Sequence, residues 1–138
     1  MEMVHGGGTD AGHRLLSDPP PRVHDLTGDG ILAIFEGPTR AVRSALAMIR
    51  AVDGIGLQIR VGTHTGEVEV VGEDVRGIAV HAAARVLGLA GAGEVLVSAT
   101  TQGLLEGSGI ELEDTGEHEL KGLAGKRRVS RVTGPVAA

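Results

Sequence analysis

Short apolar runs that suit β-strands alternate along this chain with longer segments of helical apolar period. Val23–Leu26 and Ile31–Phe35 are two such runs. Thr27–Gly30 between them predicts a hairpin, because Asp and Gly tolerate the backbone angles of a tight turn. Pro38 suits the first turn of a helix. The apolar residues after it recur at three- and four-residue spacing and predict one apolar helix face: Ala41, Val42, Ala45, Leu46, Ile49 and Val52.

The second half of the chain continues this alternation. Leu57–Thr65 alternates apolar and polar residues, as a half-buried strand does, and Val68–Val71 is predicted to pair with it around Gly66. Val75–Ala90 is predicted to form a helix, and Ser98 is predicted to cap another helix that runs to Leu105. The face of the Val75–Ala90 helix is predicted to comprise Ile78, Ala82, Val86 and Leu89, and further strands are predicted at Val95–Val97, Ile110–Thr115 and Arg128–Val132.

This order of elements predicts the α+β class, with a ferredoxin-like antiparallel sheet and helices on one face. Residues 1–22 contain Gly6–Gly8 and Pro19–Pro21 with little apolar periodicity, which predicts a flexible leader. We therefore expect one domain over residues 23–133 and a tail at 134–138. Phe35 is the only aromatic residue, so the core must be aliphatic.

Composition excludes several classes of function. The chain has no Cys, which excludes a disulfide framework and a thiolate metal site. No apolar run approaches the ~20 residues that span a bilayer, and the first residues lack the apolar region of a signal peptide. These observations predict a cytoplasmic protein. The formal net charge of −5 argues against nonspecific nucleic-acid binding, which needs a basic surface.

Three ordered motifs resemble one family. They are Leu26–Phe35 with its Gly-Asp29-Gly, Arg60–Glu67 (RVGTHTGE) and Gly77–Arg85 (GIAVHAAAR). Together they resemble the class III adenylate/guanylate cyclase catalytic domain of bacterial type. The resemblance runs from about Thr27 to Val132. The family's first strand and helix, its first metal-binding Asp and its triphosphate loop are not recognisable before Asp29, so we expect an N-terminally truncated domain.

The resemblance implies a role for each of several residues. Asp29 matches the second of two carboxylates that hold Mg²⁺ or Mn²⁺, ions that suit oxygen ligands; its simple alternative is a turn residue. Arg85 matches the arginine that stabilises charge on the α-phosphate in the transition state. His81, four residues earlier on the same helix side, stands where the family often has an Asn that orients the ribose. The alternative for both is a solvent-facing pair.

Other matched residues would bind the substrate. Asp74 matches the carboxylate that reads adenine. The alternative interpretation is that Asp74 is an acidic residue favoured by the dipole at the start of a helix. Lys121, in Gly116–Gly122 (GEHELKG), matches the lysine that holds the triphosphate, and Arg60 matches a strand arginine with the same task; either could be a surface cation. Asp25 stands where the family's base-reading partner is Lys. His64 is typical of the family, and we interpret it as structural.

The resemblance thus implies formation of 3′,5′-cyclic AMP and pyrophosphate from ATP, with GTP not excluded, in a head-to-tail homodimer. We expect low activity, because one recognised carboxylate leaves Mg²⁺ largely hydrated. The alternative is a degenerate cyclase-homology module that binds a nucleotide or a protein and catalyses nothing. The unrecognised first Asp and triphosphate loop, with Asp25 in place of Lys, favour that alternative.

Overall fold

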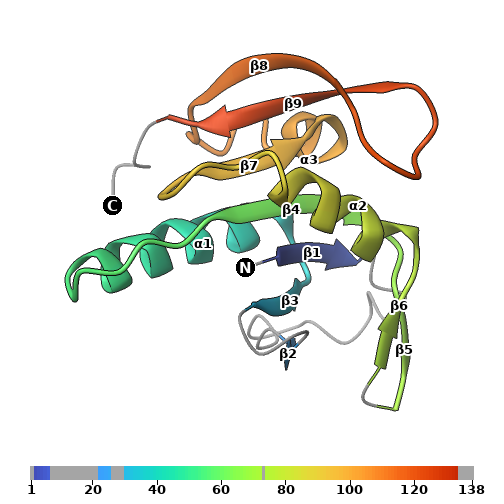
Figure 1. Cartoon of the computed structure of the whole chain (residues 1–138), viewed down its shortest axis with the longest axis horizontal. Coiled ribbons are helices and arrows are strands. Elements are labelled where there is room, and N and C mark those ends of the chain that lie inside the picture. Colours follow the sequence, from blue (N-terminus) through green and yellow to red (C-terminus); the bar gives the residue numbers. More distant parts are fainter. Residues whose placement is uncertain (1, 7–21, 26–29, 73, 134–138) are drawn as a thin grey trace.

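The computed structural model describes residues 2–6, 22–25, 30–72 and 74–133. Within them, helices are interspersed among groups of one to three strands (Figure 1). The elements are β1 (Glu2–Gly6), β2 (Arg22–Asp25), β3 (Ile31–Phe35), α1 (Pro38–Asp53), β4 (Val61–Gly66), β5 (Glu69–Val71), β6 (Asp74–Arg76), α2 (Ile78–Leu87), β7 (Val95–Ser98), α3 (Ala99–Leu104), β8 (Leu112–Glu119) and β9 (Lys126–Val132). No helix in these ranges is long and apolar enough to cross a membrane.

The main sheet has the strand order β2-β3-β1-β4-β7-β9-β8. The central pairs β3–β1, β1–β4 and β4–β7 are parallel, whereas β2–β3, β7–β9 and β9–β8 are antiparallel. The α+β class is therefore as expected. The sheet is mixed, and the expected antiparallel pairing holds toward its two edges. The predicted β2–β3 hairpin is confirmed.

Strand β1 corrects the expectation that the first strand is missing. Glu2–Gly6 lies in the middle of the sheet and pairs along its length with β4, while Glu2–His5 also pairs with β3. Residues 1–22 are therefore not a leader throughout. The strand was missed because its Met3 and Val4 give little apolar pattern. Its stability comes from pairing with two strands distant in sequence, and such tertiary context overrides weak local propensity.

Helices cover both faces of the sheet, which differs from the expected single face. Alternate residues of a strand point to opposite faces. Ala33, Phe35 and Val61 pack in one cluster with Ala41 and Ala45 of α1. Leu32 packs instead with Ala79 and Ala83 of α2. Helix α3 lies on the α1 side, where Leu105 just after it packs with Val42. Strands β4 and β7 are therefore buried from both sides.

The predicted helices α1 and α3 are confirmed, but the segment between β4 and α2 differs. Pro38 occupies the first turn of α1, and the Ser98 side chain caps α3 by accepting from the Thr101 amide. β5 pairs with β6 in a separate hairpin and not with β4. Figure 1 shows this hairpin extending away from the main sheet. Because Val75 pairs with Val70 there, α2 begins only at Ile78, which is 75% exposed.

Two glycines of β4 let α2 lie almost directly on the strand. A Cβ added to Gly62 would lie 2.8 Å from the carbonyl oxygen of Ala83 and 2.6 Å from the Cα of Leu87. A Cβ added to Gly66 would lie 2.8 Å from the Cβ of Ala79. Real carbon atoms do not approach this closely, so only Gly fits at either position. Small residues on both elements therefore set the position of α2.

We predict that Gly62→Ala destabilises the fold by about 3 kcal/mol, because backbone atoms of α2 cannot move aside cheaply. Thermal or urea unfolding followed by circular dichroism would measure the loss. Gly103→Ala in α3 is the matched control, because a Cβ there meets nothing within 4 Å. The control should gain up to ~1 kcal/mol from helix propensity. Equal stability of the two variants would contradict the close packing of α2 on β4.

Candidate functional site

Helix α2 carries two of the predicted site residues. Its buried side consists of Ala79, Ala82, Ala83 and Val86. His81 and Arg85 lie one turn apart, with His81 exposed and Arg85 of intermediate exposure. Residues four apart lie on the same side of a helix. The helix therefore holds an imidazole and a guanidinium together at the margin of its buried side.

The turn after β8 is joined to α2 through His81. Nε2 of His81 lies 3.1 Å from the carbonyl oxygen of Lys121, so Nε2–H donates to that oxygen. Gly122 has φ of +84°, and a Cβ there would lie 2.7 Å from the same Nε2. The turn thus passes against the imidazole, at a position where a side chain larger than hydrogen would collide with it. The structure brings together Lys121, His81 and the helix that bears Arg85.

Arg85 has an unusual environment. Its Nε is shielded from solvent and has no hydrogen-bond partner among the described residues. A buried donor without a partner costs roughly 1–3 kcal/mol, and native structures contain few of them. This N–H group is therefore suited to an acceptor that the described residues do not supply.

The other predicted residues lie apart from this group. Asp74 is in β6, just before the N-terminus of α2, and forms an exposed ion pair of 3.3 Å with Arg76. An exposed pair contributes ~1 kcal/mol or less, so Asp74 can exchange this partner for another. Arg60 is exposed. It precedes β4 at the end where Gly62 meets Leu87, the last residue of α2.

The length of α2 separates Asp74 from Arg60. The helix has ten residues, which is about 15 Å. Asp29 lies outside the described residues. Within those residues no group of three or more His, Asp or Glu side chains could hold a metal ion. The described part of the chain therefore does not by itself form the metal site that the resemblance implies.

Comparison with known proteins identifies the family. Residues 39–133 match the model of the adenylate and guanylate cyclase catalytic domain. This match covers well over half of the chain. The chain belongs to the adenylate/guanylate cyclase catalytic domain family. The resemblance found in the sequence motifs is confirmed.

Individual relatives agree with this membership. A Rhizobium meliloti protein named as an adenylate cyclase is 32% identical over an alignment of 111 residues. The alignment covers 74% of this chain and 19% of that protein. The cyclase domain thus spans about a fifth of that relative's length. The adenylyl cyclase CyaB of P. aeruginosa has a TM-score of 0.72 at 22% identity, covering 83% of this chain and 72% of that one.

A third structure is the guanylate cyclase domain of RhGC from Catenaria anguillulae, solved in complex with GTP. Its TM-score is 0.69 at 24% identity, with 82% of this chain and 72% of that chain covered. At these identities the two solved structures establish that the fold is shared.

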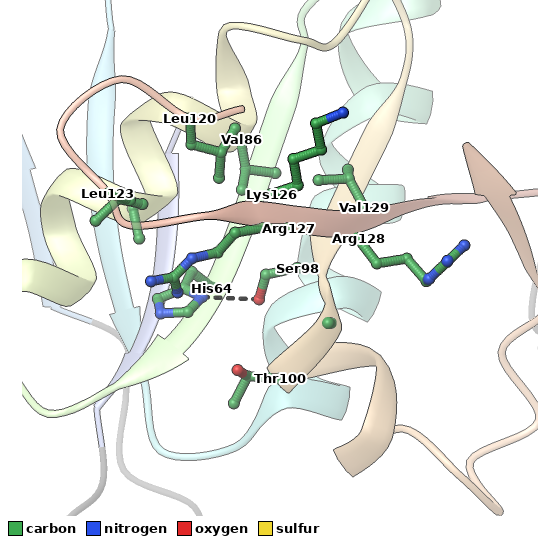
Figure 2. Close-up of a pocket in the computed structure, with 12 residues that line it drawn as sticks. His64, Val86, Ser98, Thr100, Leu120, Leu123, Lys126, Arg127, Arg128 and Val129 are labelled. Atoms are coloured by element: carbon green, nitrogen blue, oxygen red, sulfur yellow. Dashed lines mark hydrogen bonds between the residues drawn. The ribbon is translucent and has the colours of Figure 1, made fainter. Parts of the chain in front are cut away.

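A chain of polar side chains joins the ends of β4 and β7, and the sequence patterns did not reveal it. Nδ1 of His64 lies 2.7 Å from Oγ of Ser98 (Figure 2). Ser98 Oγ lies 3.2 Å from Oγ1 of Thr101, which lies 2.9 Å from Oγ1 of Thr65. The contacts from β4, His64 to Ser98 and Thr65 to Thr101, join residues more than 30 apart, so no local spacing indicates them. The network agrees with a structural role for His64.

Burial lowers the pKa of His64 below the 6.5 of an exposed imidazole, and the positive charge of Arg127 lowers it further. A neutral ring can accept at Nδ1 from the Ser98 hydroxyl. The folded domain therefore holds this proton less tightly than the unfolded chain. The stability that neutral His64 contributes is full above about pH 6.5 and is lost as the pH falls toward the lowered pKa.

We predict that His64→Asn flattens the fall in unfolding free energy between about pH 7 and pH 5. In the unmutated domain, NMR titration should give His64 a pKa below 6.5. Arg127→Gln should raise that pKa by removing a nearby positive charge, whereas Arg128→Gln should not. A His64 pKa at or above 6.5 would contradict the effects of burial and Arg127 described here.

We also predict that Gly122→Ala displaces the His81 ring, because the new Cβ would occupy the space of Nε2. The imidazole NMR signals of His81 should shift. Gly125→Ala is the matched control: φ is +69° and a Cβ there meets nothing within 4 Å. Both variants should lose about 1–2 kcal/mol from the left-handed backbone conformation, but only Gly122→Ala should move the His81 signals. Similar signals in the two variants would disprove the contact.

Proposed function

We propose that this cyclase domain binds ATP and converts it slowly to 3′,5′-cyclic AMP and pyrophosphate in a head-to-tail homodimer. The observation that carries the proposal is the grouping of His81, Arg85 and the Lys121 turn on one flank of α2. This flank offers a guanidinium with an unsatisfied N–H group, an imidazole and an exposed ammonium. These groups suit a polyanionic substrate whose negative charge increases during reaction.

In the proposed reaction the ribose 3′-oxygen attacks the α-phosphorus. The bond from that phosphorus to the bridging oxygen of the β-phosphate breaks, pyrophosphate leaves, and the hydroxyl proton passes to solvent. Arg85 would stabilise the charge that develops on the α-phosphate oxygens. A permanently charged guanidinium suits this task because it does not lose its proton.

His81 and Lys121 would hold the substrate in place. The Nε2–H of His81 is engaged by the Lys121 carbonyl, so its Nδ1 is the atom left to accept from a ribose hydroxyl. The same hydrogen bond fixes the turn that bears the Lys121 ammonium, which would pair with the triphosphate. Asp74 would accept from the exocyclic amine of adenine, after release from its exposed pair with Arg76.

The separation of Arg60 from Asp74 supports a site shared between protomers. In this arrangement one protomer supplies Asp74, His81, Arg85 and Lys121, and the other supplies Asp29 and Arg60. The resemblance implies Mg²⁺ or Mn²⁺ at Asp29. A bound divalent ion would polarise phosphoryl oxygens and favour the 3′-alkoxide. Asp25 in place of the family's Lys makes GTP the second substrate to test.

An assay of the purified domain tests the proposal. We expect slow, metal-dependent formation of cyclic AMP from ATP with Mn²⁺ or Mg²⁺, measured by mass spectrometry of the product, with GTP assayed in parallel. Arg85→Ala should lower kcat by about two orders of magnitude with little change in KM, because its interaction strengthens in the transition state. Arg43→Ala, an exposed arginine of α1 on the opposite face, is the matched control.

Mixing variants tests the shared site. Asp29→Ala and Arg85→Ala protomers should each be inactive alone, and their mixture should recover activity because each heterodimer keeps one intact site. No recovery would count against the head-to-tail geometry. ATP binding without product under either metal would assign the domain to the non-catalytic alternative. Neither binding nor product would contradict the proposal as a whole.

A further inference from the structure

A small cavity lies under α2, beside Leu120 and Leu123, which flank the Lys121 turn. Its volume is about 220 Å³. It opens between the ends of β4 and β7, the start of β9 and the buried side of α2. Val86, Leu120, Leu123 and Val129 form an apolar floor, and His64 and Ser98 lie at its polar end (Figure 2). The lining is therefore divided into an aliphatic part and a polar part.

Cations of β9 line the cavity, and the Arg127 guanidinium lies at its polar end (Figure 2). Lys126 and Arg127 line the cavity, and within the described residues neither forms a salt bridge. Figure 2 shows the Arg127 side chain lying over the His64 ring, while Arg128 points the other way. The local excess of positive charge contrasts with the net charge of −5.

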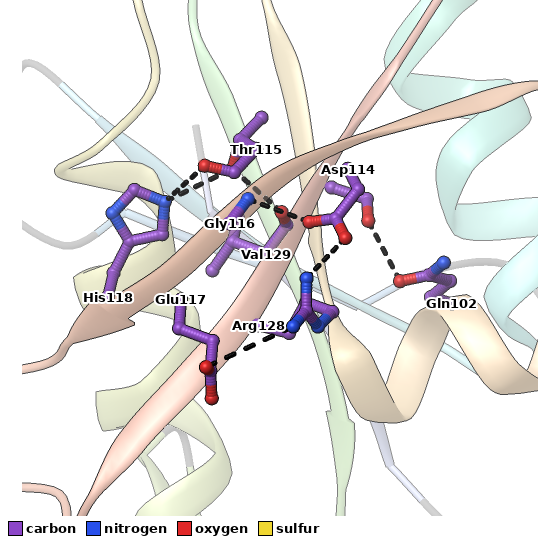
Figure 3. Close-up of polar contacts among 9 residues, drawn as sticks. Gln102, Asp114, Thr115, Gly116, Glu117, His118, Arg128 and Val129 are labelled. Carbon is purple, nitrogen blue, oxygen red and sulfur yellow. Dashed lines mark hydrogen bonds and ion pairs between the residues drawn. The ribbon is translucent and has the colours of Figure 1, made fainter.

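The neighbouring cations of the same strand are neutralised. Arg128 pairs with Asp114, and with Glu117 at 3.9 Å (Figure 3). Arg131 pairs with Glu94 at 2.9 Å and also with Glu113. Strand β9 therefore balances its charge at Arg128 and Arg131 and leaves it unbalanced at Lys126 and Arg127. Both unbalanced residues line the cavity, as does the paired Arg128.

The cavity lining also includes a hydroxyl group and small side chains. Thr100 contributes a hydroxyl to the lining. Ala82 and Ala99 also line it, and such small side chains leave the volume unfilled. A cavity of this size is below the range of roughly 300–1,000 Å³ that is usual for drug-sized ligands. It is too small for a nucleoside triphosphate and suits a molecule with a short apolar tail.

We propose that this cavity binds a small organic anion, a short-chain monocarboxylate whose tail rests on the aliphatic floor and whose carboxylate meets Arg127. A guanidinium suits a carboxylate because its planar fork can donate two parallel hydrogen bonds. The site is separate from the nucleotide site proposed above. It uses Ala82 and Val86 of α2 in place of His81 and Arg85, and it requires no catalytic activity.

Binding of three probes to the intact domain tests this site. Hexanoate has a charged head and an apolar tail, hexanol has only the tail, and inorganic phosphate has only the charge. We expect saturable binding of hexanoate with a Kd of about 1 mM, measured by calorimetry. Methyl NMR signals of Val86, Leu123 and Val129 should shift. Hexanol and phosphate should each bind at least about tenfold more weakly than hexanoate. Hexanol lacks the contact with the cation, and phosphate lacks the contacts with the aliphatic floor.

Two arginine variants give the matched comparison. Arg127→Gln should weaken hexanoate binding about tenfold or more, because the carboxylate loses its charged partner. Arg128 also lines the cavity, but its side chain is directed away from Arg127 and His64 (Figure 2) and is paired with Asp114. Arg128→Gln therefore removes the same charge from the next residue and should change the Kd less than about twofold. Both side chains are exposed, so both variants should fold, and thermal melting checks this.

Several results would overturn the proposal. They are no saturable binding of hexanoate, equal binding of hexanol or of phosphate, and equal weakening by the two arginine substitutions. Shifts confined to methyl groups outside the cavity would also overturn it. None of these measurements depends on cyclase turnover, so failure of this site is distinguishable from failure of the proposed function.

Discussion

The contact between α2 and β4 is the constraint on which the rest of the structure depends. Gly62 and Gly66 bring the helix backbone against the strand, and the alanines of α2 permit the approach. Protein interiors are close-packed and transmit small displacements. The position of His81 and Arg85 is therefore fixed by residues that carry no chemistry. The same contact determines how much space remains beside Val86, and hence the size of the cavity under the helix.

Helix α2 consequently faces two different surroundings. Its exposed margin meets the turn after β8 through His81, and its buried side closes a cavity beside His64 and Arg127. The two groups of polar residues are approached by different residues of one helix, His81 and Arg85 in one case and Ala82 and Val86 in the other. This arrangement separates anion binding at the start of β9 from the nucleotide chemistry proposed for Arg85. Each can be altered by substitutions of its own residues.

Elements with local signals could be predicted from the sequence, and those that depend on distant pairing could not. The β2–β3 hairpin, α1 and the Ser98 cap each follow from spacing within a few residues. β1 depends on two strands far along the chain, and β6 removes Val75 from the helix that its apolar pattern suggested. In the site, His81 and Arg85 follow from helical spacing, whereas contact with the Lys121 turn is tertiary.

The alanine-lined face of α2 also has an evolutionary consequence. Ala79 and Ala83 are almost fully buried against a strand that has no room to yield. Substitutions at these two positions are confined to residues no larger than alanine, while the exposed positions beside them are free to vary. Lineages of such domains can therefore diversify the chemistry of the helix surface one residue at a time, with its position on the sheet inherited unchanged.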